Sequence, residues 1–93
     1  MGLNHKIIFS QRIDHILDRG ETRDAIDQRL VSWVDHLGAT PIPVPNNLNP
    51  KKSLIDWLNI ISPNAVILSG GNDLGQFPIR DNTETCILNY AEK

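Results

Sequence analysis

The sequence is poor in the features that mark several large classes of protein. It has one cysteine, Cys86, so an internal disulfide is excluded and a reducing compartment such as the cytoplasm is expected. Its 9 basic and 11 acidic residues are interspersed and form no basic face with aromatic side chains, so nucleic acid is not an expected partner. No apolar run approaches the roughly 20 residues of a membrane span, and the opening MGLNHKIIFS turns polar too soon for a signal peptide. We therefore expect a cytoplasmic protein that binds neither nucleic acid nor membranes.

What the sequence does contain is a series of short apolar segments that alternate with amphipathic ones. Residues 6–10, 40–45 and 65–68 are predicted to be strands. The segment 40–45, TPIPVP, has proline at every second position, which removes the amide donors on one side and predicts an edge strand. The segment 65–68, AVIL, is apolar without alternation, which is typical of a parallel strand covered on both faces.

The segments around these strands predict three helices and a loop. The apolar stripe of the first helix, residues 22–37, consists of Ile26, Leu30, Trp33, Val34 and Leu37. The inward residues of the second helix, 53–61, are Leu54, Trp57, Leu58 and Ile61. The third helix is expected to begin at Asp81, with Glu84 three residues later completing a capping box. Residues 11–21 are predicted to be a polar loop that holds Arg12, Asp14 and Arg19, either for a ligand or in surface salt bridges.

This order of elements predicts an α/β fold with a parallel sheet and helices on both faces. With the proline-rich strand at one edge, the expected strand order is second, first, third, which places the segment 65–68 at the other end of the sheet. A flat, fully apolar strand at an open edge is an aggregation hazard that native proteins avoid. We therefore expect the sheet to be unfinished, so that either the natural chain continues past Lys93 or another chain completes the sheet.

Four segments occur in an order and at a spacing that resemble one family. They are RGETRDAID at 19–27, PIPVP at 41–45, ILSGGND at 67–73 and RDNTE at 80–84. Together they resemble the N-terminal part of a class I glutamine amidotransferase-like domain, and within it the γ-glutamyl-γ-aminobutyrate hydrolase-like branch. The resemblance covers nearly the whole chain. It implies a flavodoxin-like three-layer sandwich with a parallel sheet, of which residues 1–93 are the N-terminal portion.

The resemblance also implies a reaction. Members of the family hydrolyse a γ-glutamyl amide, commonly glutamine, through a cysteine thioester, and a His and an acidic residue follow much later in the chain. The elbow that carries the nucleophile would lie past Lys93, so this chain alone is expected to be inactive and to need no cofactor. The segment 74–79 is shorter than its counterpart in many hydrolases of the γ-glutamyl-γ-aminobutyrate type. That favours glutamine as the small-molecule substrate, with the ammonia passed to a synthetase partner.

The site residues that the resemblance implies surround a pair of glycines. The N–H of Gly71 is the expected oxyanion donor, because fixed donors stabilise the charge that develops on an attacked amide carbonyl. Gly70 permits the turn and leaves the backbone open to a substrate, although a glycine pair can also mark a plain tight turn. Asn72 and Asp73 are expected either to bind the glutamyl amino or carboxylate group or to bond their own turn.

Arg80 is the remaining substrate-binding candidate. It is expected either to pair with Asp81 at the rim of the site or to be a solvated charge beside a helix cap. Cys86 is not expected to be the nucleophile, since it lies within a helix and lacks elbow glycines, and a small buried apolar residue is the better interpretation. No metal site is predicted. None of the histidines, His5, His15 and His36, is spaced from an acidic or thiol residue in the way that metal ligands are.

A second hypothesis stays open beside the enzymatic one. The chain could be a non-catalytic assembly or binding module that keeps the first half of the fold and pairs with another subunit. This hypothesis predicts a stable complex that covers the segment 65–68.

Overall fold

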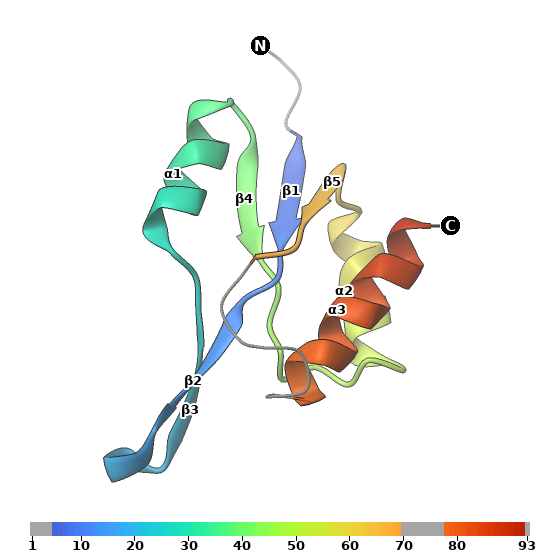
Figure 1. Cartoon of the computed structure of the whole chain (residues 1–93). Coiled ribbons are helices and arrows are strands. Elements are labelled where there is room, and N and C mark those ends of the chain that lie inside the picture. Colours follow the sequence, from blue (N-terminus) through green and yellow to red (C-terminus); the bar gives the residue numbers. More distant parts are fainter. Residues whose placement is uncertain (1–4, 70–77, 93) are drawn as a thin grey trace.

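A computed structural model describes residues 5–69 and 78–92, and its centre is a parallel three-stranded sheet (Figure 1). Its strands, in spatial order, are β4 (Thr40–Pro43), β1 (Lys6–Phe9) and β5 (Ala65–Ile67). Ile8 pairs with Ile42 on one side and with Val66 on the other. The chain is therefore a mixed α/β protein, and the three predicted strands lie in the predicted order of second, first and third.

The proline-rich strand β4 occupies one edge of this sheet, as the sequence predicts. The N–H groups of Thr40 and Val44 donate to the carbonyls of His5 and Phe9, both on the β1 side. The backbone of the odd-numbered residues faces away from β1, and on that side Pro41 and Pro43 have no N–H group to donate. The outer edge of β4 therefore lacks the donors that a further strand would need.

Helices α2 (Ser53–Ile61) and α3 (Pro78–Ala91) cover one face of the sheet, while α1 (Gln28–His36) lies beside β4 on the far side from them (Figure 1). The main core consists of fully buried residues from β1, α2, α3 and the β4–α2 connection, namely Ile8, Val44, Leu54, Leu58 and Ile87. Ile42, Val66, Trp57 and Ile61 pack against it. The predicted helix 53–61 and its four inward residues are thus confirmed.

The segment 11–27 is where the structure departs most from the sequence-based expectation. Strands β2 (Arg12–Ile16) and β3 (Glu21–Ala25) form an antiparallel hairpin, joined by a 3-10 turn at Leu17–Arg19. The predicted polar loop and the predicted helix start at 22 are therefore wrong. The physical reason is that the two segments pair from Arg12 with Ala25 to Ile16 with Glu21, and Gly20 supplies the left-handed φ of 61° that closes the turn.

Helix α1 begins only at Gln28, after Asp27 has capped it. The Asp27 carboxylate accepts a hydrogen bond of 2.8 Å from the N–H of Arg29. Of the predicted apolar stripe, Val34 is fully buried, whereas Trp33 is 53% exposed and Leu37 is 57% exposed. The stripe is real at its centre but narrower than predicted, because this helix covers only the edge of a small sheet.

The remaining corrections concern β5 and α3. Ala65 and Leu68 are exposed rather than covered on both faces, because β5 pairs only with β1 within the part of the chain that the structure describes. Helix α3 begins at Pro78, a residue suited to a first helical turn, so Asp81 already lies inside the helix. The predicted capping box at Asp81 and Glu84 is therefore wrong.

Candidate functional site

The carboxyl end of β1 is joined to the carboxyl end of β5 by two serines. The N–H of Ser10 donates to the carbonyl of Ile67 at 3.1 Å, and the Ser69 N–H donates to Ser10 Oγ at 2.9 Å. In the other direction, Ser69 Oγ donates to the Ser10 carbonyl at 2.6 Å. These bonds continue the pairing of the two strands beyond their last residues, and they fix the backbone at Ser69.

Helix α3 adds a buried ion pair to this end of the sheet. Arg80 is 4% exposed, and its Nη2 lies 3.0 Å from Oε2 of Glu84. The same Oε2 accepts a hydrogen bond of 2.7 Å from Ser10 Oγ. Arg80 also donates from Nε to the Gln11 carbonyl at 3.0 Å and from Nη2 to the carbonyl of Ser69. The guanidinium thus holds the backbone ends of two strands at once, and its bonds to charged and carbonyl partners offset the cost of burying it.

This geometry bears on one of the two predictions for Arg80. The side chain is not a solvated charge, since its guanidinium is buried against Glu84 and backbone carbonyls. The four other predicted site residues, Gly70, Gly71, Asn72 and Asp73, lie outside the described residues. They follow directly on Ser69, the residue whose carbonyl Arg80 binds. The structure therefore brings Arg80 to the start of the predicted glycine turn.

A second polar cluster lies on the β4 side of the same edge. Asn46 is 3% exposed and donates from Nδ2 to the Gln11 carbonyl at 3.1 Å and to Oδ1 of Asp24 at 2.9 Å. The other carboxylate oxygen of Asp24 accepts the Asn46 N–H at 3.0 Å. Gln11 Nε2 in turn donates to the Val44 carbonyl at 2.9 Å. This cluster ties the hairpin to the segment that leaves β4.

Sequence reasoning did not single out Ser10, Gln11, Asn46 and Glu84 as site residues. A signal for three of them is present in the sequence: each is a polar residue within a few positions after a predicted strand, at the edge where parallel strands place their ligands. Glu84 carries no such signal. Its role depends on α3 starting at Pro78, which turns Glu84 toward Arg80 four residues earlier.

The hairpin residues proposed for a ligand have other partners. Arg12 lies 3.3 Å from Asp14, and both side chains are largely exposed, at 54% and 39%. Arg19 is exposed in the turn. For this group the surface salt-bridge alternative describes what the structure shows.

Cys86 and the histidines lie away from the polar edge of the sheet. Cys86 is partly buried against the core, and its Sγ lies 3.4 Å from the Pro50 carbonyl. His5 and His36 are exposed, and His15 Nδ1 lies 3.0 Å from Thr22 Oγ1. Among the described residues, no three His, Cys, Asp or Glu side chains come close enough together to hold a metal ion.

One carboxyl group near this edge is strongly perturbed. Hydrogen bonds from the side chain and the backbone of Arg29 lower the pKa of Asp27 from 3.8 to about 2. The Arg29 guanidinium contacts both carboxylate oxygens, at 3.1 Å and 2.8 Å for Oδ2 and 3.3 Å for Oδ1. The carboxylate is occupied in capping α1, so it is a structural group.

No protein-family model and no curated protein sequence matches the chain. None of the helices in the described part of the chain has the length and apolarity needed to cross a bilayer. The motifs and the geometry of the polar edge are therefore the features that bear on the function of this chain.

Proposed function

We propose that this chain is part of a thiol-dependent glutamine amidotransferase or γ-glutamyl hydrolase of the cytoplasm, with a flavodoxin-like sheet. The enzyme would hydrolyse a γ-glutamyl amide, with glutamine the favoured substrate, and pass the released ammonia to a synthetase partner. The Gly71 N–H would serve as one oxyanion donor and Gly70 as the turn that exposes it. Asn72 and Asp73 would contact the glutamyl group.

The observation that supports this proposal most is the support of the backbone immediately before Gly70. Ser69 is held at its N–H by Ser10, at its hydroxyl by Ser10 and at its carbonyl by Arg80. An oxyanion donor is effective only when it is fixed in place before the reaction, because its reorganisation would otherwise cost energy in the transition state. A buried second layer that locks the preceding residue is the kind of support such a donor needs.

This arrangement changes the role proposed for Arg80. A buried guanidinium that binds the Gln11 and Ser69 carbonyls is a positioning residue for the turn, and we no longer assign it a direct contact with substrate. Glu84 and Ser10 share that role, since one Glu84 oxygen binds both Arg80 and Ser10.

The reaction needs a nucleophile that this chain does not provide. An attack on the amide carbonyl by a thiolate forms the tetrahedral oxyanion, expels ammonia and leaves a thioester, which water then hydrolyses to glutamate. Cys86 is unsuitable, because its Sγ faces the Pro50 carbonyl within the α2–α3 region. The thiol must come from a segment that follows or from a partner chain.

Two measurements test the proposal. The 93-residue chain alone should release no ammonia from glutamine, and turnover by it would refute the missing nucleophile. The tagged chain, purified from cells with its bound partners, should then be treated with an electrophilic glutamine analogue. We expect the label on a cysteine outside this chain, with Cys86→Ser as the matched control that leaves labelling unchanged. Labelling that disappears in Cys86→Ser would overturn the assignment.

A second function is favoured by one observation, the open edge of β5. Within the described residues this strand pairs on one side only, and Leu68 beside it is 42% exposed. The chain would then be an assembly module whose sheet is completed by another chain. Light scattering after size-exclusion chromatography separates the cases: a stable complex that Leu68→Lys dissolves supports assembly, whereas a folded monomer at micromolar concentration contradicts it.

A further inference from the structure

A pocket of about 300 Å³ opens between the β2–β3 hairpin, the segment after β4 and the start of α3. Its lining consists of Ile13, Thr22, Asp24, Asn46, Asn47 and Ile79. That volume lies at the lower end of the range for small-molecule sites, enough for a ligand of a few heavy atoms. The pocket lies on the β4 side of the polar edge, across β1 from Ser69.

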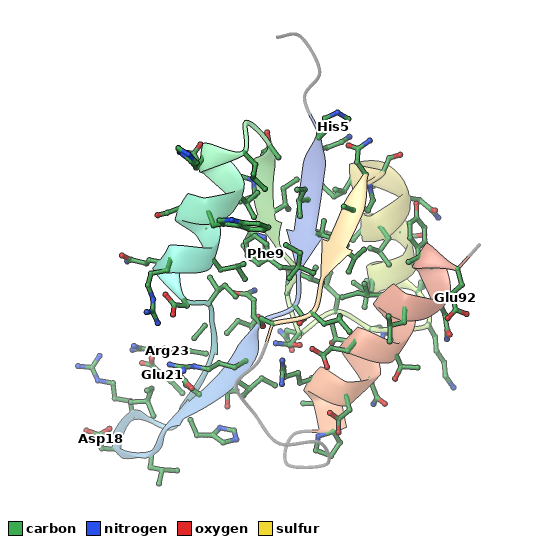
Figure 2. All side chains as sticks on the ribbon, turned by 45° about the horizontal axis from the view of Figure 1, so that its top comes forward. His5, Phe9, Asp18, Glu21, Arg23 and Glu92 are labelled. Carbon is green, nitrogen blue, oxygen red and sulfur yellow. The ribbon has the colours of Figure 1, made fainter. Side chains whose placement is uncertain are left out.

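The hairpin turns one chemical face toward this pocket and another away from it. Ile13 pairs with Asp24, and His15 pairs with Thr22, so these residues share one face of the two strands. The arginines lie on the other face, where Arg12 and Arg23 each contact a carboxylate, as Figure 2 shows for Arg23 and Glu21. None of the six lining residues is basic. Among the described residues that line the pocket, Asp24 is therefore the one with a charged side chain.

The side-chain amide oxygen of Asn46 is a hydrogen-bond acceptor to which no donor in the described residues is bound. Both hydrogens on its Nδ2 are used, by the Gln11 carbonyl and by Asp24 Oδ1. This fixes the orientation of the amide, since both of those partners are acceptors. Its Oδ1 is buried and has no hydrogen-bond partner among the described residues. A buried carbonyl oxygen without a donor costs about 1–3 kcal/mol, so such an atom is a reason to look for a ligand.

We propose that this pocket binds the protonated amino group of a small molecule. The ammonium has three donors and no acceptor, which complements the free lone pairs of Asp24 and the polar side chains of Asn46 and Asn47 in the lining. Ile13 and Ile79 provide apolar walls for the carbon chain that carries the ammonium. A carboxylate ligand is disfavoured, because Asp24 would repel it. The site goes beyond the proposed hydrolase function, since binding here requires neither a thiol nor the glycine turn.

The test uses three probes of equal length and different charge: n-butylammonium, n-butanol and butyrate. Each is titrated into the 15N-labelled 93-residue chain, and the backbone signals of Thr22 and Asp24 and the side-chain amides of Asn46 and Asn47 are followed by NMR. We expect saturable shifts with butylammonium, weaker shifts with butanol and none with butyrate. Equal shifts with all three probes, or no shifts at these four residues with butylammonium, would overturn the proposal.

A pair of matched variants locates the charge that is responsible. Asp24→Asn removes the pocket carboxylate and should weaken butylammonium binding roughly fivefold, as expected for a partly exposed ion pair. Asp14→Asn removes the same charge from the opposite face of the same hairpin and should leave binding unchanged. Equal weakening by both variants would show that only the overall charge matters, which contradicts a site at Asp24. If Asp24→Asn does not fold, the three-probe comparison on the unmodified chain still decides the question.

The outcome is separable from that of the proposed hydrolase function. Butylammonium binding does not require hydrolysis, and labelling by a glutamine analogue does not require this pocket. Either result can therefore fail while the other stands.

Discussion

Two ion pairs, one at the carboxyl end of the parallel sheet and one on the β2–β3 hairpin, differ in burial. Arg80 and Glu84 have side chains that are 5% and 20% exposed, and they hold the ends of two strands. Arg23 and Glu21 on the hairpin are 51% and 45% exposed, and they contact each other on the same strand, β3 (Figure 2). Both pairs have short distances, 3.0 Å and 2.6 Å, so distance alone does not distinguish them.

The burial of an ion pair decides how much it contributes to stability. An exposed pair exchanges water for a partner at little net gain. A buried pair leaves an uncompensated charge inside the protein when one partner is removed.

Arg80→Met should destabilise the chain by about 3 kcal/mol, at the low end for a buried pair, because Glu84 is partly buried and would lose its cation. A domain of this size has a free energy of unfolding of about 5–15 kcal/mol, so the loss should be plain in urea denaturation. The double variant Arg80→Met/Glu84→Leu should recover much of the loss, since no charge is then stranded. A double variant as unstable as the single one would show that the backbone bonds of Arg80 matter more than its charge pair.

Ser10→Ala should cost about 1–3 kcal/mol, because it removes the acceptor for the Ser69 N–H and the donor to Glu84. The expected signature is local, namely faster hydrogen exchange at the Ser69 amide than in the unmodified chain. Ser32→Ala, at an exposed position of α1, is the control that should leave exchange there unaltered. Unchanged protection at Ser69 in Ser10→Ala would contradict the support that we assign to Ser10.

Arg23→Gln should change the stability by less than about 1 kcal/mol, as is usual for exposed pairs. Raising the salt concentration should reduce even that effect, because salt screens solvent-exposed charges. Urea denaturation at low and high salt measures both. A loss comparable to that of Arg80→Met would remove the contrast between the two sets of pairs.

The smallest effect should come from Asp27, whose side chain is 52% exposed and whose pKa is nevertheless lowered to about 2. Because the pKa is lower in the folded chain, the contribution to stability is complete above pH 3.8 and is lost as the pH falls toward 2. Arg29→Gln should move the pKa of Asp27 back toward 3.8, since Arg29 is the main cause of the shift. NMR of the Asp27 carboxyl carbon across this pH range measures the pKa. A pKa that stays at about 2 in Arg29→Gln would show that the end of the helix, and not the Arg29 side chain, lowers it.

The sequence was sufficient for the parallel sheet and for α2, because those elements depend on local patterns. The prolines of TPIPVP predict an edge strand by chemistry that no tertiary contact overrides. The apolar residues of 53–61 have helical spacing, and Ser62 follows as the cap, so the helix was predicted with its correct bounds. In these segments the local preference agrees with the final structure.

The hairpin and the buried ion pair were beyond sequence reasoning for physical reasons. Residues 12–25 have few apolar side chains, so no alternation of apolar and polar residues marks the two strands. The spacing of Arg80 and Glu84 is that of an i,i+4 pair once both residues lie in one helix, but nothing local indicates that Arg80 also binds the carbonyl of Ser69. Such contacts are set by where α3 docks on the sheet, which is a long-range property. The glycine turn itself, Gly70 to Asp73, stays a prediction.

The prolines of β4 have a consequence for how copies of this molecule could associate. The β4 edge of the sheet cannot pair with a further strand, since Pro41 and Pro43 lack the N–H donors that such pairing requires. Among the described residues, β5 forms the other edge of this three-stranded sheet and contains no proline. Two molecules that joined through their β5 strands would leave the proline-blocked β4 strands as the edges of the combined parallel sheet, so that extension of this sheet would stop at a pair instead of running on into a fibril.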